Sequence, residues 1–136
     1  MSNPAFALQE AMRARLLAQA PLVLLLQGQH VFDEVPRGAR TPHVSFGAIE
    51  TRDWSVADAK AHEHFVTLQV STNSRGRKLA QDILAEIEAA LDNAALTLAG
   101  HALVNLRLVF WAVAKEKSGE TYGATARFRA ATEPLN

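Results

Sequence analysis

Apolar residues recur at helical spacing in a first segment near the N-terminus. Asn3 and Pro4 predict a helix start there, because Asn caps a first turn and Pro suits the first helical position. The apolar stripe that follows consists of Leu8, Ala11, Met12 and Leu16. Pro21 ends this helix, and residues 21–27 add one more turn before Gly28 stops it.

A second helical pattern spans residues 75–91, after a cap at Asn73-Ser74. Its buried face is predicted to consist of Leu79, Ile83, Leu84, Ile87 and Leu91. Asp82, Glu86 and Glu88 fall on the opposite side, which we expect to face water.

Two-residue alternation predicts strands in the rest of the chain. Residues 31–35 and 43–48 form a hairpin-like pair around a turn rich in Pro and Gly, and residues 65–71 alternate most cleanly. A short strand is predicted at 96–98. Residues 51–62 lack any period and are predicted to be a mobile loop.

Two long strands end the chain and flank a polar hairpin turn at residues 115–120. For the first, residues 102–115, one predicted face holds Val104, Leu106, Leu108, Phe110 and Ala112. The other face holds Asn105, Arg107, Val109, Trp111 and Val113. The last strand is predicted to point Tyr122, Ala124, Ala126, Phe128 and Ala130 inward.

The order of these elements is α-β-β-β-α-β-β. It predicts an α+β fold in which an antiparallel sheet packs against two main helices. The length of 136 residues fits a single domain over 1–136.

Charge and composition narrow the function classes. Fourteen basic residues balance fourteen acidic ones, so no global field favours nucleic acid, membranes or acidic substrates. The chain has no cysteine, which removes disulfides and thiol chemistry and fits a cytosolic site of synthesis. Its longest apolar run, residues 21–26, is too short to span a bilayer, and the N-terminus lacks the order of a signal peptide.

Histidines and carboxylates give the candidates for site chemistry. Asp33, Glu34 and Asp53 could supply paired carboxylates, but nothing in the sequence fixes their separation. His62 and His64 share one strand face and could chelate a metal if His101 or His43 supplied a third ligand. We favour a solvated strand entrance, with no metal and no cofactor. The sequence lacks a Gly-rich phosphate loop and a nucleophile elbow, so we predict a protein that is not an enzyme.

Arginine and tryptophan point to a contact surface, because both are enriched among binding hot spots. Arg107, Arg127 and Arg129 are predicted to share one sheet face, where they can be solvated or can meet a neighbouring subunit. The candidate partner interface consists of Arg52, Trp54, Arg107, Trp111, Arg127 and Arg129.

Short motifs in a fixed order resemble the tail-completion or tail-terminator family of long non-contractile-tailed phages and gene transfer agents. The motifs are V-F-D-x-V-P-x-G from Val31, P-x-V-S-F-G from Pro42, S-R-G-R from Ser74, L-A-G-H-x-L-V from Leu98 and Y-G-A-x-x-R-F-R-A from Tyr122. The similarity extends over nearly the whole chain.

This resemblance implies a structural virion assembly protein that forms a ring, typically of six subunits. Such a ring caps the tail tube and joins it to the head-side connector, so the implied partners are tail tube protein, connector or stopper protein and further copies of the chain. DNA passes through only as cargo. The implied location is the tail end near the head, with assembly in the bacterial cytoplasm. Two alternatives stay open: a head-side connector or stopper, and a small metal-binding enzyme using His62, His64 and His101.

Overall fold

A computed structural model of the chain describes residues 3–117 and 119–135. Its elements, in chain order, are α1 (Pro4–Leu17), α2 (Ala20–Leu26), β1 (Val31–Phe32), β2 (His43–Asp53), β3 (His62–Ser71), α3 (Lys78–Leu91), β4 (Thr97–Leu98), β5 (His101–Lys115) and β6 (Tyr122–Pro134). The predicted α+β class is confirmed. The extra turn after Pro21 is the helix α2 and the short piece near Leu98 is β4, so the observed order is α-α-β-β-β-α-β-β-β.

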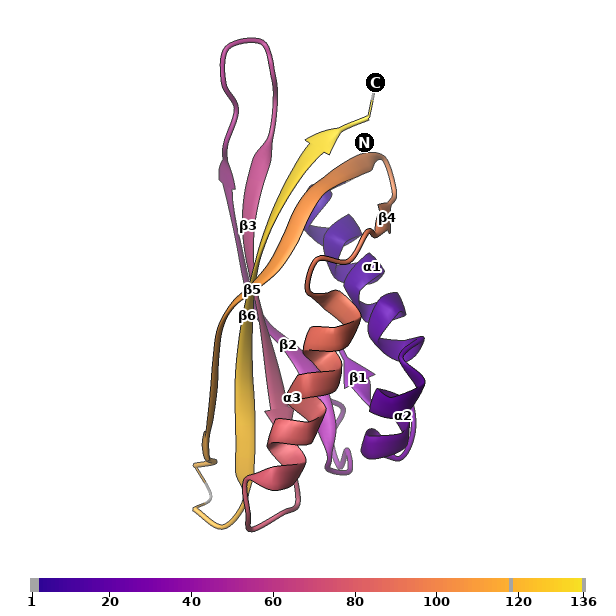
Figure 1. Cartoon of the computed structure of the whole chain (residues 1–136), viewed down its shortest axis with the longest axis vertical. Helices are drawn as coiled ribbons and strands as arrows, with labels where there is room; N and C mark the ends of the chain where they lie inside the picture. Colours follow the sequence, from indigo (N-terminus) through magenta and orange to yellow (C-terminus); the bar gives the residue numbers. More distant parts are fainter. Residues whose placement is uncertain (1–2, 118, 136) are drawn as a thin grey trace.

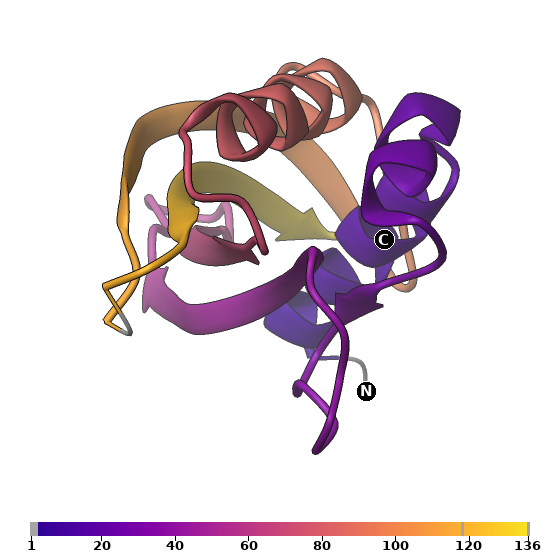
Figure 2. The ribbon, with the colours of Figure 1, turned by 90° about the horizontal axis from the view of Figure 1, so that it is seen from below.

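The strands of the described residues form one twisted sheet in the order β1-β2-β3-β6-β5-β4 (Figure 1). Each neighbouring pair from β2 to β4 is antiparallel. All three helices cover the same face of the sheet, as the view along its length shows (Figure 2). We call the opposite face, which carries no helix, the outer face.

The predicted hairpin-like pair at residues 31–48 is wrong in one respect. β1 is only two residues long and runs parallel to β2, with Val31 beside Val44. Parallel strands need a longer connection than a tight turn. The Pro- and Gly-rich segment 33–42 makes this connection by looping away from the sheet before β2 begins.

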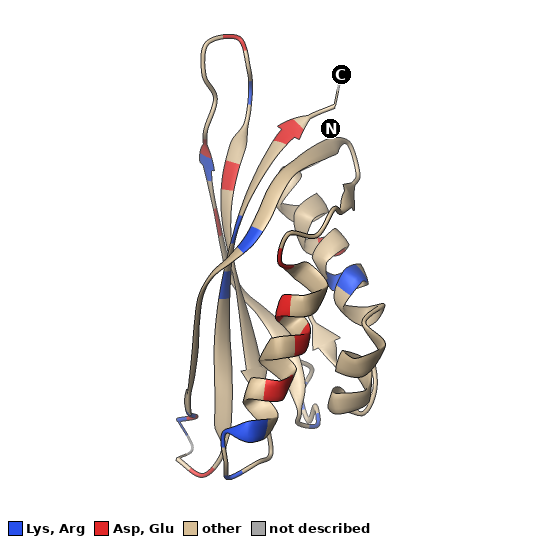
Figure 3. Ribbon diagram, in the orientation of Figure 1, with Lys and Arg blue, Asp and Glu red and all other residues tan. Residues whose placement is uncertain are grey.

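The predicted apolar stripes form the core between the helices and the sheet. Leu8, Met12 and Leu16 of α1 are fully buried, and Asn3 caps that helix by accepting hydrogen bonds from the amides of Ala5 and Phe6. The inward positions of β6 are also buried, with Phe128 the largest. The acidic residues of α3 follow one another along the helix (Figure 3). Glu88 is exposed as predicted, whereas Asp82 and Glu86 are partly buried beside α2, where Glu86 accepts a hydrogen bond from Gln19 at 2.9 Å. In the described residues no helix is long and apolar enough to cross a membrane.

Three β-bulges among the described residues change which side chains face the core. One lies between Phe46 and Ile49 of β2, and the other two lie in β5, between Leu103 and Asn105 and between Leu108 and Phe110. A bulge adds one residue to one strand, so the alternation of side chains switches beyond it. In β5 the switch places Trp111 beside Ala126 on the helix-covered face, whereas Phe110 lies beside Arg127 on the outer face. The predicted assignment of these two aromatic residues to faces is therefore reversed.

The predicted loop at residues 51–62 is instead a long hairpin. β2 continues to Asp53 and β3 begins at His62, and the connection closes through backbone hydrogen bonds from Trp54 to Ala61 and between Val56 and Ala59. We call residues 52–63 the arm, because this hairpin projects beyond the rest of the sheet (Figure 1).

Candidate assembly surface

Most of the predicted interface residues lie close together on the outer face. In the antiparallel register Arg52 lies beside Glu63, and Arg107 lies directly beside Arg129. Two arginines directly opposite each other repel, so this arrangement needs nearby acidic groups.

Glu63 supplies the central acidic group of this cluster. Its carboxylate is almost completely buried, and it accepts hydrogen bonds from Nε of Arg52 and from Nε of Arg129, the latter at 2.6 Å. The hydrogen bond from Arg129 is the main reason that the pKa of Glu63 is lowered, and Arg52 adds to it. Arg129 also donates from Nη1 to Asn105 at 3.3 Å. Glu63 thus fixes both arginines at the base of the arm.

Trp54 lies on top of this cluster. The guanidinium carbon of Arg129 is 5.0 Å from the centroid of the Trp54 ring, which is a cation–π arrangement. The tryptophan remains 44% exposed. Asp53 turns the chain after it by accepting a hydrogen bond from the amide of Ser55 at 3.0 Å, and hydrogen bonding to Ser55 lowers the pKa of this carboxylate. The arm therefore presents a preformed aromatic surface.

The other two arginines also have acidic partners. Arg127 lies 3.2 Å from Glu50 and 4.7 Å from the centre of the Phe65 ring. Arg107 lies 3.4 Å from Asp92. Each arginine of the predicted interface is thus paired with a carboxylate, so the outer face offers planar cationic groups without a large net charge.

Trp111 does not join this cluster. Because of the bulge in β5, its side chain lies on the helix-covered face, where it borders a shallow hollow with Val113 and the α3 residues Leu84 and Glu88. It is 55% exposed, since β5 extends past the edge of the helix layer. The predicted interface is therefore split between the two faces of the sheet.

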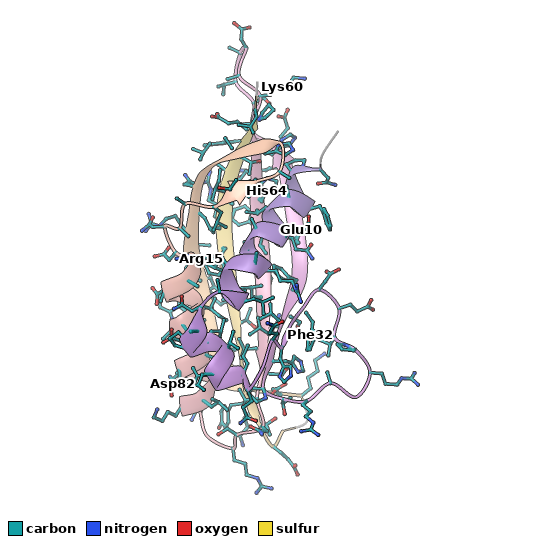
Figure 4. The ribbon with its side chains drawn as sticks, turned by 90° about the vertical axis from the view of Figure 1, so that its right-hand side faces the viewer. Glu10, Arg15, Phe32, Lys60, His64 and Asp82 are labelled. Carbon is teal, nitrogen blue, oxygen red and sulfur yellow. The ribbon has the colours of Figure 1, made fainter. Side chains whose placement is uncertain are left out.

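The histidines adopt a different arrangement from the solvated entrance that we predicted. His64 is completely buried, and its two ring nitrogens contact the hydroxyls of Thr51 and Thr132, each at 2.8 Å. It lies on the sheet just below the arm that carries Lys60 (Figure 4). The His62 ring lies 6.3 Å from that of His64. No group of three or more His, Cys, Asp or Glu side chains that could hold a metal occurs in residues 3–117 and 119–135.

Burial of His64 makes folding sensitive to acid. Burial lowers its pKa from 6.5 to about 4, with smaller effects from His62 and His101. Between these two values the unfolded chain binds the proton and the folded chain does not, so stability falls as pH falls below 6.5. We expect the free energy of unfolding to drop by about 2 kcal/mol between pH 7 and pH 5 through this group. Urea titrations at both pH values measure the drop.

The matched variant for this experiment is His64→Gln, which keeps hydrogen-bonding groups but does not titrate. Its stability should change much less than that of the natural chain between pH 7 and pH 5. An imidazole NMR titration that gave His64 a pKa near 6.5 in the folded protein would contradict this expectation.

Sequence reasoning missed two features of this surface. It did not predict that Glu63 is buried between arginines, because one acidic residue between two histidines looks like an ordinary exposed strand position. It also missed the exposure of Phe110, because a bulge leaves no mark in the alternation of residue types. The outward positions of Arg127 and Arg129 on the neighbouring strand were the only available signal that Glu63 would be enclosed by cations.

The sequence matches the family model described as "Tail completion protein gp17" over residues 10–133. The chain belongs to this family. Among solved structures it is similar to a chain in "Virion of native gene transfer agent (GTA) particle", at 30% sequence identity and a TM-score of 0.87, covering 95% of this chain and 96% of that one. It also shares the fold of "Structure of bacteriophage SPP1 gp17 protein", at 22% identity and a TM-score of 0.67, covering 98% and 91% of the two chains. A search of curated protein sequences finds no match.

Proposed function

We propose that this tail completion protein is a ring-forming tail terminator of a phage or gene transfer agent. In this role copies of the chain, six by the family resemblance, close the end of the tail tube and give the head-side connector a surface to bind. The observation that carries the proposal is the match of residues 10–133 to the family, together with the similarity of nearly the whole chain to a protein of a gene transfer agent virion. The whole chain, 1–136, acts as one domain in this role.

The surface of the protein supports a function in protein–protein contact. Large apolar side chains are exposed on the arm and on β5, where Trp54, Phe110 and Trp111 are each about half exposed. Exposed aromatic residues beside arginine are typical of binding hot spots. The paired charges of the outer face fit a surface that DNA passes without being held, because tight backbone binding needs unpaired cations.

The resulting location is the head-proximal end of the tail, after assembly in the bacterial cytoplasm. Its neighbours there are the tail tube protein on one side and the connector or stopper on the other. No step of this function uses a cofactor, a metal or a catalytic residue.

Deletion of the gene from a producing strain tests the proposal. Without a terminator nothing stops tube growth, so we expect overlong tails without heads, measured by electron microscopy of the lysate. Supplying the gene in trans should restore tails of uniform length joined to heads. Tails of normal length together with heads that lose their DNA would instead indicate a head-side stopper and would contradict the terminator role.

A further inference from the structure

Two stretches of the sheet have an edge without a neighbouring strand among the described residues. β1 pairs only with Val44 and Ser45 of β2, so the edge of β2 is open over residues 47–53. β4 pairs only with the first two residues of β5, and the chain at Asp92 and Asn93 covers β5 near Leu106 and Leu108. Residues 110–115 of β5 therefore pair only with β6, and Val109 is the bulged residue before them.

The open edge of β5 is apolar. Val109, Phe110 and Trp111 are 49%, 52% and 55% exposed, and no charged residue occurs between Arg107 and Lys115. Soluble proteins usually blunt such an edge with charges, proline or a covering element, because it readily pairs with another strand. The bulge between Leu108 and Phe110 interrupts the start of this edge, but residues 110–114 have no charge, no proline and no covering element among the described residues, so they remain available to a partner strand.

We infer that this partner is the open β2 edge of a second copy of the chain, residues 47–53. This inference rests on the proposed ring and names the contact that closes it. Both stretches are seven residues long when Val109 is counted, and β5 runs antiparallel to β2 within one subunit. A second copy placed beside the first therefore continues the sheet with the same antiparallel alternation. The contact joins two different edges, which is the head-to-tail geometry that makes rings.

The faces of the two strands restrict the register to steps of two residues. Ile49 and Thr51 lie on the helix-covered face, as do Trp111 and Val113, whereas Glu50, Phe110 and Ala112 lie on the outer face. A slip of one residue would place opposite faces together. The register that pairs both stretches along their full length sets Trp111 against Thr51 of the partner subunit and Ala112 against the partner's Glu50. No two like charges meet in it.

This register also gives the strand tilt of a closed barrel. Within one subunit Trp111 lies in the same row of the sheet as Phe46. The row runs from Trp111 to its partner Ala126 on β6, then to Leu68 on β3 and to Phe46 on β2. Thr51 pairs with His64, which is four rows along β3 from Leu68. The second copy is thus shifted along the strand direction by four residue rows relative to the first. Each copy contributes four long strands, so the shift is one row per strand. With about 3.3 Å per residue and about 4.8 Å between strands, the tilt is about 35°. Closed barrels have tilts of about 35–45°. A displacement of two rows would give only about 20°.

Engineered cysteines test this contact, because the natural chain has none. Glu50 and Ala112 lie on the outer face with β3 and β6 between them, about 14 Å apart across the strands alone. A disulfide needs Cα atoms closer than about 7 Å, so the pair cannot close within one subunit. We expect the Glu50→Cys/Ala112→Cys variant, after oxidation, to give a ladder of covalent multimers on a non-reducing gel.

The matched control is Glu50→Cys/Asn105→Cys, which uses the same two strands and the same face outside the inferred pair. It and the two single-cysteine variants should give no multimers beyond dimers. Native mass spectrometry of the natural chain, alone and with tail tube protein, shows independently whether a ring forms.

The outcomes separate the two proposals. A ring by native mass without the covalent ladder overturns the edge pairing and leaves the ring intact. A monomer under both conditions overturns the ring, and the edge pairing with it. If hydrogen exchange of residues 109–115 slows only when tail tube protein is added to a ring that has already formed, the tube covers this edge and the inference is wrong.

Discussion

Replacing Phe128 with alanine is expected to lower the free energy of unfolding by about 3–5 kcal/mol, the usual cost of removing a large buried aromatic side chain. Phe128 is fully buried and lies between Val66 of β3 and Leu108 of β5, on the face that the helices cover. The cavity left there cannot refill easily, since both neighbouring strands are held in the middle of the sheet. Urea unfolding at pH 7 measures the loss.

The control for this change is Phe6→Ala, because Phe6 is 55% exposed on α1. It should change the free energy of unfolding by less than about 1 kcal/mol. If Phe128→Ala cost no more than Phe6→Ala, the assignment of the β6 inward face to the core would be contradicted.

Trp54→Ala is expected to act on assembly and not on folding. In the isolated chain Trp54 contributes mainly its contact with the Arg129 guanidinium, which is worth about 0.5–1 kcal/mol at an exposed site. In the assembled particle we expect its ring to be buried by a partner, so truncation should weaken assembly by about 2 kcal/mol or more. This corresponds to an affinity about 30-fold lower. Unfolding in urea and the concentration dependence of assembly onto tail tubes measure the two effects.

Phe6→Ala is also the control for the assembly experiment, because it removes a similarly exposed aromatic side chain outside the proposed surface. It should leave assembly unchanged. Should Trp54→Ala destabilise the isolated chain as strongly as Phe128→Ala, then Trp54 belongs to the core and the arm is not a partner surface.

Regular periodicity explains why much of the fold could be predicted. The stripe of Leu8, Met12 and Leu16 is buried as expected, because a helix packed on one face must repeat apolar residues every three or four positions. The alternation in β3 and β6 likewise survives because both strands lie inside the sheet, where each side chain has only two possible faces. These segments contain no bulge that would change the alternation.

The features that escaped prediction are those without a local periodic signal. The bulge near Val109 reverses the faces of Phe110 and Trp111, and nothing in the composition of β5 marks it. β1 pairs in parallel with a strand that begins eleven residues after it ends, which depends on the path of the connecting segment. The arm looked irregular because an extended hairpin exposed on both faces does not need alternating residues.

The candidate surface could be predicted only in part, because the pairing of its side chains also has no local signal in the sequence. Arginine and tryptophan drew attention as residue types, and five of the six predicted residues, Arg52, Trp54, Arg107, Arg127 and Arg129, do lie on the outer face. The carboxylates that pair with the arginines could not be assigned from the sequence, because they come from three separate elements. Their positions depend on the register between strands, which the order of residues alone does not specify.

The arm at one end of the sheet makes the two ends of the molecule unlike. The arm end carries Trp54 and Val56 on a projecting hairpin. The other end holds the start of α3 and the turn after β5, where five basic residues, Arg75, Arg77, Lys78, Lys115 and Lys117, outnumber the acidic Glu116 and Glu120 (Figure 3). A ring whose axis follows the strands would then have one rim with projecting hairpins and one rim with a net positive charge. Such a ring has a built-in polarity, so it can be inserted between two different neighbours in one orientation only.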